Sequence, residues 1–181
     1  MKKKIGILLA LLVLLFAIVA ILVALQPSTF ALERETVVEA KPEVVFNLVN
    51  DFHQWDRWSP WAKLDPDMET TYTGPESGKG AIYTWNGNSE VGEGRMTIKE
   101  SKPNEEITIF LEFMKPFEAT NNTLFTFSPA GDGTRVVWSM SGENNFIAKA
   151  FNMLMDMDAM VGASFEQGLA DMKAAAEADA K

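Results

Sequence analysis

Two side chains of this chain have positions that could support proton transfer. His53 is the single histidine, and Asp158 lies within the apolar side of a long helical pattern near the C-terminus. An imidazole titrates near neutral pH, and a carboxyl group withdrawn from water can act as an acid or a base. No nucleophile or metal ligand accompanies His53, which argues against a catalytic role. For Asp158 the alternative is a buried or cavity-rim ion pair with Arg57, Arg95 or Arg135.

Other common chemistry lacks the residues to carry it. The chain has no cysteine, so it has no thiol nucleophile, no disulfide and no cysteine metal site. One histidine leaves only carboxylates as metal ligands, and their spacing matches no recognisable metal motif. Gly92, Gly94 and the glycine-rich turns lack the lysine and the strand-to-helix context of a phosphate loop. We therefore expect no metal and no cofactor.

The charge of the chain excludes a further class of partner. The formal net charge is −9, but Lys2, Lys3 and Lys4 all precede a long apolar run. From Gln26 onward, 13 basic residues face 25 acidic ones, which gives −12. Such a domain repels phosphate backbones and anionic lipid surfaces, so we expect no nucleic-acid partner.

The apolar run predicts a membrane anchor. Ile5 to Leu25 is 21 consecutive apolar residues, which as a helix spans a bilayer core of about 30 Å. A cleaved signal peptide is the alternative, but its apolar region is shorter, about 7–15 residues, and only Thr29-Phe30-Ala31 offers a small-residue cleavage site. The basic start should stay cytoplasmic, which places the remainder outside the cytoplasm, in the periplasm if the source is bacterial. We expect an anchor over 1–25, a tether over 26–31 and one domain over 32–178.

The rest of the chain alternates like an antiparallel sheet between helices. Pro42 opens a helix that ends near Asp51, and one long amphipathic helix is expected from Phe146 to Ala178. Between them, apolar and polar residues alternate, which is typical of a sheet covered on one face. The class is therefore α+β. The predicted strands are Leu32–Ala40, Thr70–Thr73, Gly80–Trp85, Val91–Glu100, Glu106–Phe113, Glu118–Ser128 and Thr134–Ser141.

The long C-terminal helix differs from an ordinary core helix. It carries a cluster of four methionines, and Gly162 and Gly168 interrupt it. Methionine fills irregular space, and glycine inside a helix usually has a packing reason. These features predict an apolar cavity between the helix and the sheet, with a solid, Met-rich core as the alternative. Likewise, Trp55, Trp58 and Trp61 either edge the mouth of this cavity or form a satellite core that pins a loop.

The order of these elements resembles a known superfamily. The helix that Pro42 opens is followed by W-x-x-W-S-P-W, a strand meander and a long final helix. Together they resemble the START-like (SRPBCC) superfamily, and within it the polyketide cyclase/dehydrase-like group, over about 32–177. The resemblance is carried by Trp55, Trp58-Ser59-Pro60-Trp61, Gly74-Pro75, Gly78, Gly80, Trp85, Val91-Gly92-Glu93-Gly94, Gly133-Thr134, Trp138, Gly142, Met155-Asp156-Met157-Asp158, Phe165-Glu166 and Gly168-Leu169.

This resemblance implies a helix-grip fold, in which a curved antiparallel sheet wraps a long C-terminal helix around an apolar cavity. Members bind or transport lipids, sterols and polyketides, and some catalyse cyclisation or dehydration. The family name therefore implies no single activity, and function must be argued from the site.

Three functional hypotheses follow. The first is a membrane-anchored domain that binds a small hydrophobic ligand or lipid without altering it. The second is a cyclase or dehydratase with Asp158 or His53 as proton carrier. The third is an envelope protein with a filled interior that acts through protein partners. The strand alternation and the apolar side of the helix give the candidate ligand-binding residues, which are Trp58, Tyr83, Trp85, Met96, Phe113, Phe125, Trp138, Met140, Met157, Val161 and Phe165.

Overall fold

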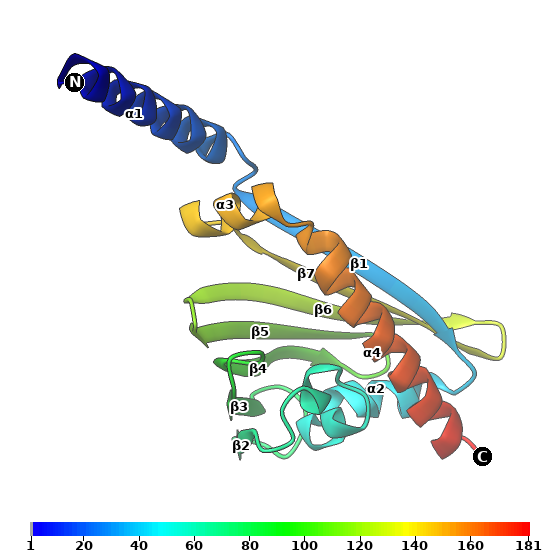
Figure 1. Cartoon of the computed structure of the whole chain (residues 1–181). Coiled ribbons are helices and arrows are strands. Elements are labelled where there is room, and N and C mark those ends of the chain that lie inside the picture. The colour runs from blue at the N-terminus through cyan, green and yellow to red at the C-terminus, as the bar shows by residue number, and fades with distance from the viewer. Residues whose placement is uncertain (1) are drawn as a thin grey trace.

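The computed structural model describes residues 2–181, and it contains one sheet, one N-terminal helix apart from it and several helices against or beside it (Figure 1). Strands occupy all seven predicted regions. The elements are α1 (Lys2–Ala24), β1 (Thr29–Val38), α2 (Pro42–Asn50), the 3-10 helices η1 (Phe52–Arg57) and η2 (Trp61–Lys63), β2 (Glu69–Thr73), β3 (Ile82–Asn86), β4 (Glu93–Lys102), β5 (Glu106–Lys115), β6 (Ala119–Ala130), β7 (Gly133–Glu143), α3 (Phe146–Leu154) and α4 (Met157–Asp179).

The sheet has the strand order β1-β7-β6-β5-β4-β3-β2, and every neighbouring pair is antiparallel. The first strand therefore pairs with the last, and β2 to β7 follow one another as a meander. Figure 1 shows α4 running across one face of this sheet, with α2 beside it. This arrangement confirms the predicted α+β helix-grip fold.

The face toward α4, here called the inner face, carries the apolar half of each strand. On β5, Ile107 and Ile109 are fully buried while Thr108 between them is half-exposed. The same period of two buries Phe125 on β6 and Trp138 on β7. Because only one face is apolar, one layer of helices is sufficient to cover it.

The tryptophan segment belongs to the core. Trp55 donates its indole N–H to the carbonyl of Val49 at 3.1 Å, and Trp58 donates to the carbonyl of Leu48 at 2.8 Å. Both rings are buried, and Trp58 packs edge-on against Trp138 at a centroid distance of 5.6 Å. The loop after α2 is thus pinned as expected, but by the main core and not by a separate satellite core.

The prediction of one helix from Phe146 to Ala178 is wrong. The chain breaks at Met155 and Asp156, because the Asp156 carboxylate accepts a hydrogen bond from the Ala159 N–H at 2.9 Å and so begins α4 as its N-cap. Separately, β1 begins at Thr29, so the last three residues of the expected tether belong to the sheet.

The two helix glycines have the expected packing reasons. A Cβ on Gly168 would lie 2.9 Å from Trp138 Cζ3 and 3.1 Å from Pro60 Cδ. A Cβ on Gly162 would overlap the guanidinium group of Arg34, which crosses α4 at this point. Both glycines let α4 approach its neighbours more closely than any other residue would.

Gly94 on β4 has the same role for Trp85. The Trp85 ring lies over Gly94, and its N–H donates to the carbonyl of Val91 at 3.0 Å. A Cβ on Gly94 would overlap this ring and lie 2.5 Å from the backbone oxygen of Glu112. The backbone on one side and a buried ring on the other leave no room for it.

Replacing Gly94 with alanine should therefore destabilise the protein. We expect Gly94→Ala to lower the free energy of unfolding by about 1–3 kcal/mol, the usual cost of overpacking. The measurement is urea unfolding of the full-length chain in mild detergent, followed by tryptophan fluorescence. Thr97→Ala, on the same strand but the opposite face, is the control and should cost under about 1 kcal/mol. Equal losses in the two variants would contradict this account.

Candidate ligand-binding site

The eleven predicted ligand-binding residues fall into two groups in the structure. Six are buried in the core: Trp58, Tyr83, Trp85, Phe125, Trp138 and Phe165. The other five are half-exposed: Met96, Phe113, Met140, Met157 and Val161, and all of these except Met157 pack against the core.

The first group fills the interior where the sequence predicts a cavity. Trp138 stacks on Phe165 of α4 at a centroid distance of 3.8 Å and an interplanar angle of 12°. On its other side it stacks on Phe125 at 4.9 Å and 26°. A ring clamped between two others leaves no space for a ligand. Around Trp138 the structure therefore has the solid core, and the expectation of a cavity is wrong there.

The second group lies toward the end of the sheet next to α3. Strand register places Phe30, Gly142, Asn121, Leu111 and Met96 side by side in one row across five strands. Gly142 is one residue from the end of β7, after which the chain turns into α3. We call the inward-facing residues at this end the inner patch, and they are Phe30, Leu32, Met96, Leu111, Phe113, Asn121, Thr123 and Met140.

Two polar side chains stand in the inner patch without partners. Asn121 is 7% exposed and Thr123 is 5% exposed. Within residues 2–181, neither side chain has a hydrogen-bond partner, although Thr134, equally buried on β7, donates to the carbonyl of Ala40 at 2.7 Å. The buried indole N–H of Trp138 also lacks a partner among the described residues. An unpaired buried polar group costs about 1–3 kcal/mol, a cost that falls in full on the Trp138 N–H, whereas the polar atoms of Asn121 and Thr123 keep slight contact with solvent.

Gly142 makes room for the Asn121 amide. A Cβ on Gly142 would overlap Oδ1 of Asn121 and lie 2.8 Å from Cε1 of Phe30. The amide and the Phe30 ring therefore lie over the bare backbone of Gly142. An apolar surface with a few fixed polar groups is the usual composition of a small-molecule site.

Asn121 and Thr123 are absent from the sequence-based candidates, although a signal for them exists. They precede Phe125 by four and two residues on β6, so period-two alternation places all three on one face. The predicted inner face included only aromatic and aliphatic residues. Polar residues in inward register therefore went unassigned.

Asp158 does not face the inner patch. It lies in the first turn of α4, and its side chain is 63% exposed. Its partner is Arg34 of β1 at 3.3 Å, and none of Arg57, Arg95 and Arg135 pairs with it among the ion pairs that residues 2–181 form. Of the two expected ion-pair settings, the buried one is therefore wrong, and the partner is Arg34 in place of the three arginines considered.

Arg34 fastens β1 to α4. Its Nε donates to Glu166 Oε1 at 2.9 Å, and its Nη2 donates to the backbone oxygen of Asp158 at 3.3 Å. Hydrogen bonds to Asp158 and then to Glu166 raise the pKa of Arg34 above its ordinary value. This cluster holds the helix in place and brings no proton carrier to the inner patch.

His53 also lies away from the inner patch. It is exposed on η1, where its Nδ1 is 2.8 Å from Oδ1 of Asp51 and its ring stacks on Tyr72 at 4.0 Å. These contacts fix an edge of the domain near β2. No group of three or more His, Asp or Glu side chains suited to a metal is found in the part of the chain that the structure describes.

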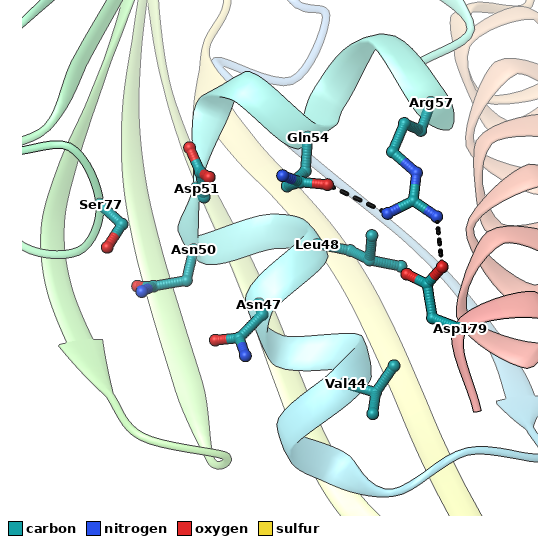
Figure 2. A pocket seen from close by; sticks show the side chains of 9 residues that line it. All are labelled: Val44, Asn47, Leu48, Asn50, Asp51, Gln54, Arg57, Ser77 and Asp179. Atoms are coloured by element: carbon teal, nitrogen blue, oxygen red, sulfur yellow. Dashed lines mark hydrogen bonds and ion pairs between the residues drawn. The ribbon is translucent and has the colours of Figure 1, made fainter. Parts of the chain in front are cut away.

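The domain surface has two hollows, and one of them shares Leu32 and Met140 with the inner patch. One, of about 410 Å³, lies between α2, η1 and the end of α4 (Figure 2). There Arg57 bridges Gln54 and Asp179, and its hydrogen bond lowers the pKa of Asp179. Asn47, Asn50 and Asp51 make this hollow polar. The other, of about 340 Å³, is lined by Ala31, Leu32, Glu33, Ser139, Met140 and Ser141, four of which face away from α4.

A family model matches residues 29–177, and its description is polyketide cyclase / dehydrase and lipid transport. The chain belongs to this family. The match covers β1 to α4 and so confirms the superfamily that the sequence resembles. No curated protein matches the chain by sequence.

Solved structures share the fold at low sequence identity. Protein CV1439 of Chromobacterium violaceum is 18% identical with a TM-score of 0.59, over 83% of this chain and 98% of its own. A protein of Rhizobium leguminosarum is 14% identical with a TM-score of 0.60, over 82% and 95%. The Aha1 dimer of Colwellia psychrerythraea is 14% identical with a TM-score of 0.58, over 82% of this chain and 96% of its own. The chain therefore adopts a fold that proteins of very different sequence share.

Two buried threonines allow a matched test of the inner patch. Thr134→Val removes a hydrogen bond from a buried site and should lower the free energy of unfolding by about 1 kcal/mol. Thr123→Val removes an unpaired hydroxyl and should leave stability unchanged or raise it. Urea unfolding of the two full-length variants measures the difference. A loss for Thr123→Val as large as that for Thr134→Val would show that Thr123 is structurally satisfied.

The buried phenol of Tyr83 predicts a loss of stability at alkaline pH. Burial, followed by the neighbouring Tyr72, raises the pKa of Tyr83 well above its usual value of about 10. Its stabilising contribution is therefore complete below pH 10 and is lost as the pH rises above 10.

We expect Tyr72→Phe, in which Tyr83 is the one remaining tyrosine, to show no tyrosinate absorbance at pH 11 while it is folded. Its free energy of unfolding should fall between pH 10 and 11 more steeply than in a variant that also carries Tyr83→Phe. Parallel pH profiles for the two variants would refute the attribution of the alkaline loss of stability to Tyr83.

Proposed function

We propose that this protein is a membrane-anchored domain that binds a small hydrophobic ligand or lipid at the inner patch without altering it. The observation that carries the proposal is the pair Asn121 and Thr123, buried in an apolar surface with no partner in residues 2–181. Their polar atoms keep slight solvent contact, so they are free to bond an incoming polar group. A ligand with a carbonyl or hydroxyl group would pair with them.

The surroundings of these residues specify the chemistry of the ligand. Phe30, Leu111, Phe113 and Met140 are half-exposed apolar side chains next to the two polar ones. Such a surface favours an amphipathic molecule with a long apolar body and one uncharged polar group. The family description includes lipid transport, which is in line with this class.

The N-terminal helix supports anchoring. Lys3–Ala24 of α1 is long and apolar enough to cross a membrane, although a signal sequence has the same properties. We propose that residues 1–25 stay attached as the anchor and that residues 26–28 lead into a ligand-binding domain that begins with β1 at Thr29 and ends near residue 178. Lys2, Lys3 and Lys4 then remain cytoplasmic, and the domain lies on the opposite side.

A catalytic role has less support at this site. The family description includes cyclase and dehydrase, and such chemistry requires a proton carrier beside the substrate. None of the eight residues of the inner patch titrates, and both Asp158 and His53 are engaged elsewhere. Binding without reaction is therefore the function that the geometry supports best.

The experiment is native mass spectrometry of the full-length chain released from detergent, followed by extraction of any bound species. Asn121→Leu should reduce affinity for that species about tenfold or more through the loss of one hydrogen bond to a buried amide. It should not reduce the free energy of unfolding. The control is Asn122→Leu, whose side chain is exposed on the opposite face and whose binding should be unchanged.

Two results would overturn the proposal. The first is a folded protein that carries no ligand and takes up no apolar fluorescent probe, which would put action through protein partners first. The second is equal affinity in Asn121→Leu and Asn122→Leu, which would place the ligand somewhere other than the inner patch.

A further inference from the structure

The helix α3 exposes an apolar surface that the rest of the domain leaves uncovered. None of its residues is buried, and Leu154 at its end is 79% exposed. The exposed side chains continue into the next turn and onto the β5–β6 turn, where Phe117 lies 6.3 Å from Phe151. We call this set the α3 surface: Phe117, Phe146, Ile147, Phe151, Met153, Leu154, Met155 and Met160.

Hydrogen bonds hold α3 against the end of α1. Asn144, just before α3, donates its N–H to the carbonyl of Ser28 at 2.8 Å and its side-chain N–H to that of Pro27 at 3.2 Å. Lys149 Nζ donates to the carbonyl of Ala24 at 3.3 Å. Val23 of α1 is only 3% exposed, and α3 is the element that packs on α1 (Figure 1).

This contact sets the depth of α3 relative to a bilayer. The apolar run of α1 ends at Leu25, two residues after Val23, which is about 3 Å along a helix axis. If α1 spans the membrane, the hydrocarbon core of the bilayer ends near Leu25. A helix that packs on Val23 then lies at the boundary between the hydrocarbon and the headgroups.

We propose that the α3 surface lies in the interface of the same bilayer that α1 crosses. This inference rests on the anchoring part of the proposed function and adds a second, independent point of membrane contact. The partner is the lipid surface because α3 packs against the end of α1 that would leave the membrane. Amphipathic helices of this kind bury their apolar face about 5–10 Å into the headgroup and acyl boundary.

The association depends on apolar contact and not on charge. Lys149 is the one charged residue within Phe146–Leu154, and its ammonium group is already bound to the carbonyl of Ala24. Asp156 and Asp158 follow immediately, in a domain that carries a formal charge of −12 from Gln26 onward. Anionic lipid should therefore not strengthen the contact.

The inner patch opens at the same end of the sheet. Gly142 and Met140 lead directly along β7 toward α3, and the half-exposed Met157 and Val161 lie in the first turns of α4. An α3 surface held in the lipid interface therefore places the inner patch next to the bilayer. A lipid would reach Asn121 without crossing bulk water.

The absence of cysteine allows single-site labelling of the full-length chain. Leu154→Cys probes the α3 surface, and Phe16→Cys probes the middle of α1. Asp132→Cys is the control in the β6–β7 turn, a full strand of 11 residues away from α3. Each variant carries an environment-sensitive fluorophore and is reconstituted in phosphatidylcholine vesicles with and without lipids spin-labelled near the top of the acyl chain.

We expect the label at 154 to lose about half of its emission or more to the spin-labelled lipid, as an interfacial depth of 5–10 Å requires. The label at 16 should be shielded from aqueous quenchers, and the label at 132 should be unaffected by the lipid quencher. Adding phosphatidylserine should not increase quenching at 154. Unchanged tryptophan emission confirms that each variant is folded.

The possible failures are distinguishable. A label at 154 that behaves like the one at 132, with the label at 16 still inside the bilayer, overturns the inference and leaves the anchor intact. A label at 16 that is open to water overturns the anchor and this inference together, while ligand binding is judged by mass spectrometry. In the unlabelled Leu154→Cys protein, disulfide formation between two chains, together with no lipid quenching of the labelled protein, would assign the α3 surface to a second copy and also overturn the inference.

Discussion

The domain depends on one stacking interaction, that of Phe165 in α4 on Trp138 in β7. The two ring centroids lie 3.8 Å apart and the rings are nearly parallel. Gly168, one turn further along α4, removes the side chain that would hold the helix away from Trp138 and Pro60. The stack in turn determines where the interior is solid, because Phe125 and Trp58 complete the shell around Trp138.

At the other end of the sheet, the helix break leaves the inner face only partly covered. Asp156 is the N-cap of α4, and the residues before it form the separate helix α3, which packs against α1. The N-terminal turns of α4 cover the inner face only in part, since Met157 and Val161 are half-exposed. Arg34 holds these turns to β1 through Glu166 and the backbone of Asp158. The inner face of the sheet is therefore densely packed around Trp138 and only partly covered at the end next to α3.

The fold could be predicted from sequence because alternation, turn residues and the tryptophan motif act locally and agree with one another. All seven strands, the helix at Pro42 and the packing reasons for Gly162 and Gly168 were expected. The helix break was missed because Asp156 fits the polar side of a helical wheel as well as an N-cap position. Arg34 and Asn121 were missed because their roles arise from pairings across more than a hundred residues or from inward register. Six of the eleven expected ligand-binding residues form core because local alternation identifies an inner face but not the space above it.

The connection between α1 and the sheet limits how far the domain can travel. Four residues, Leu25 to Ser28, separate α1 from β1, and β1 is paired with β7 along its whole length from Thr29 to Val38. Even fully extended, such a link reaches only about 13 Å. With α1 as the anchor, the domain keeps a fixed orientation and cannot diffuse across an aqueous compartment with its cargo. Any ligand it holds must be collected and released beside the one membrane that α1 crosses, and delivery to a distant second membrane would require another carrier.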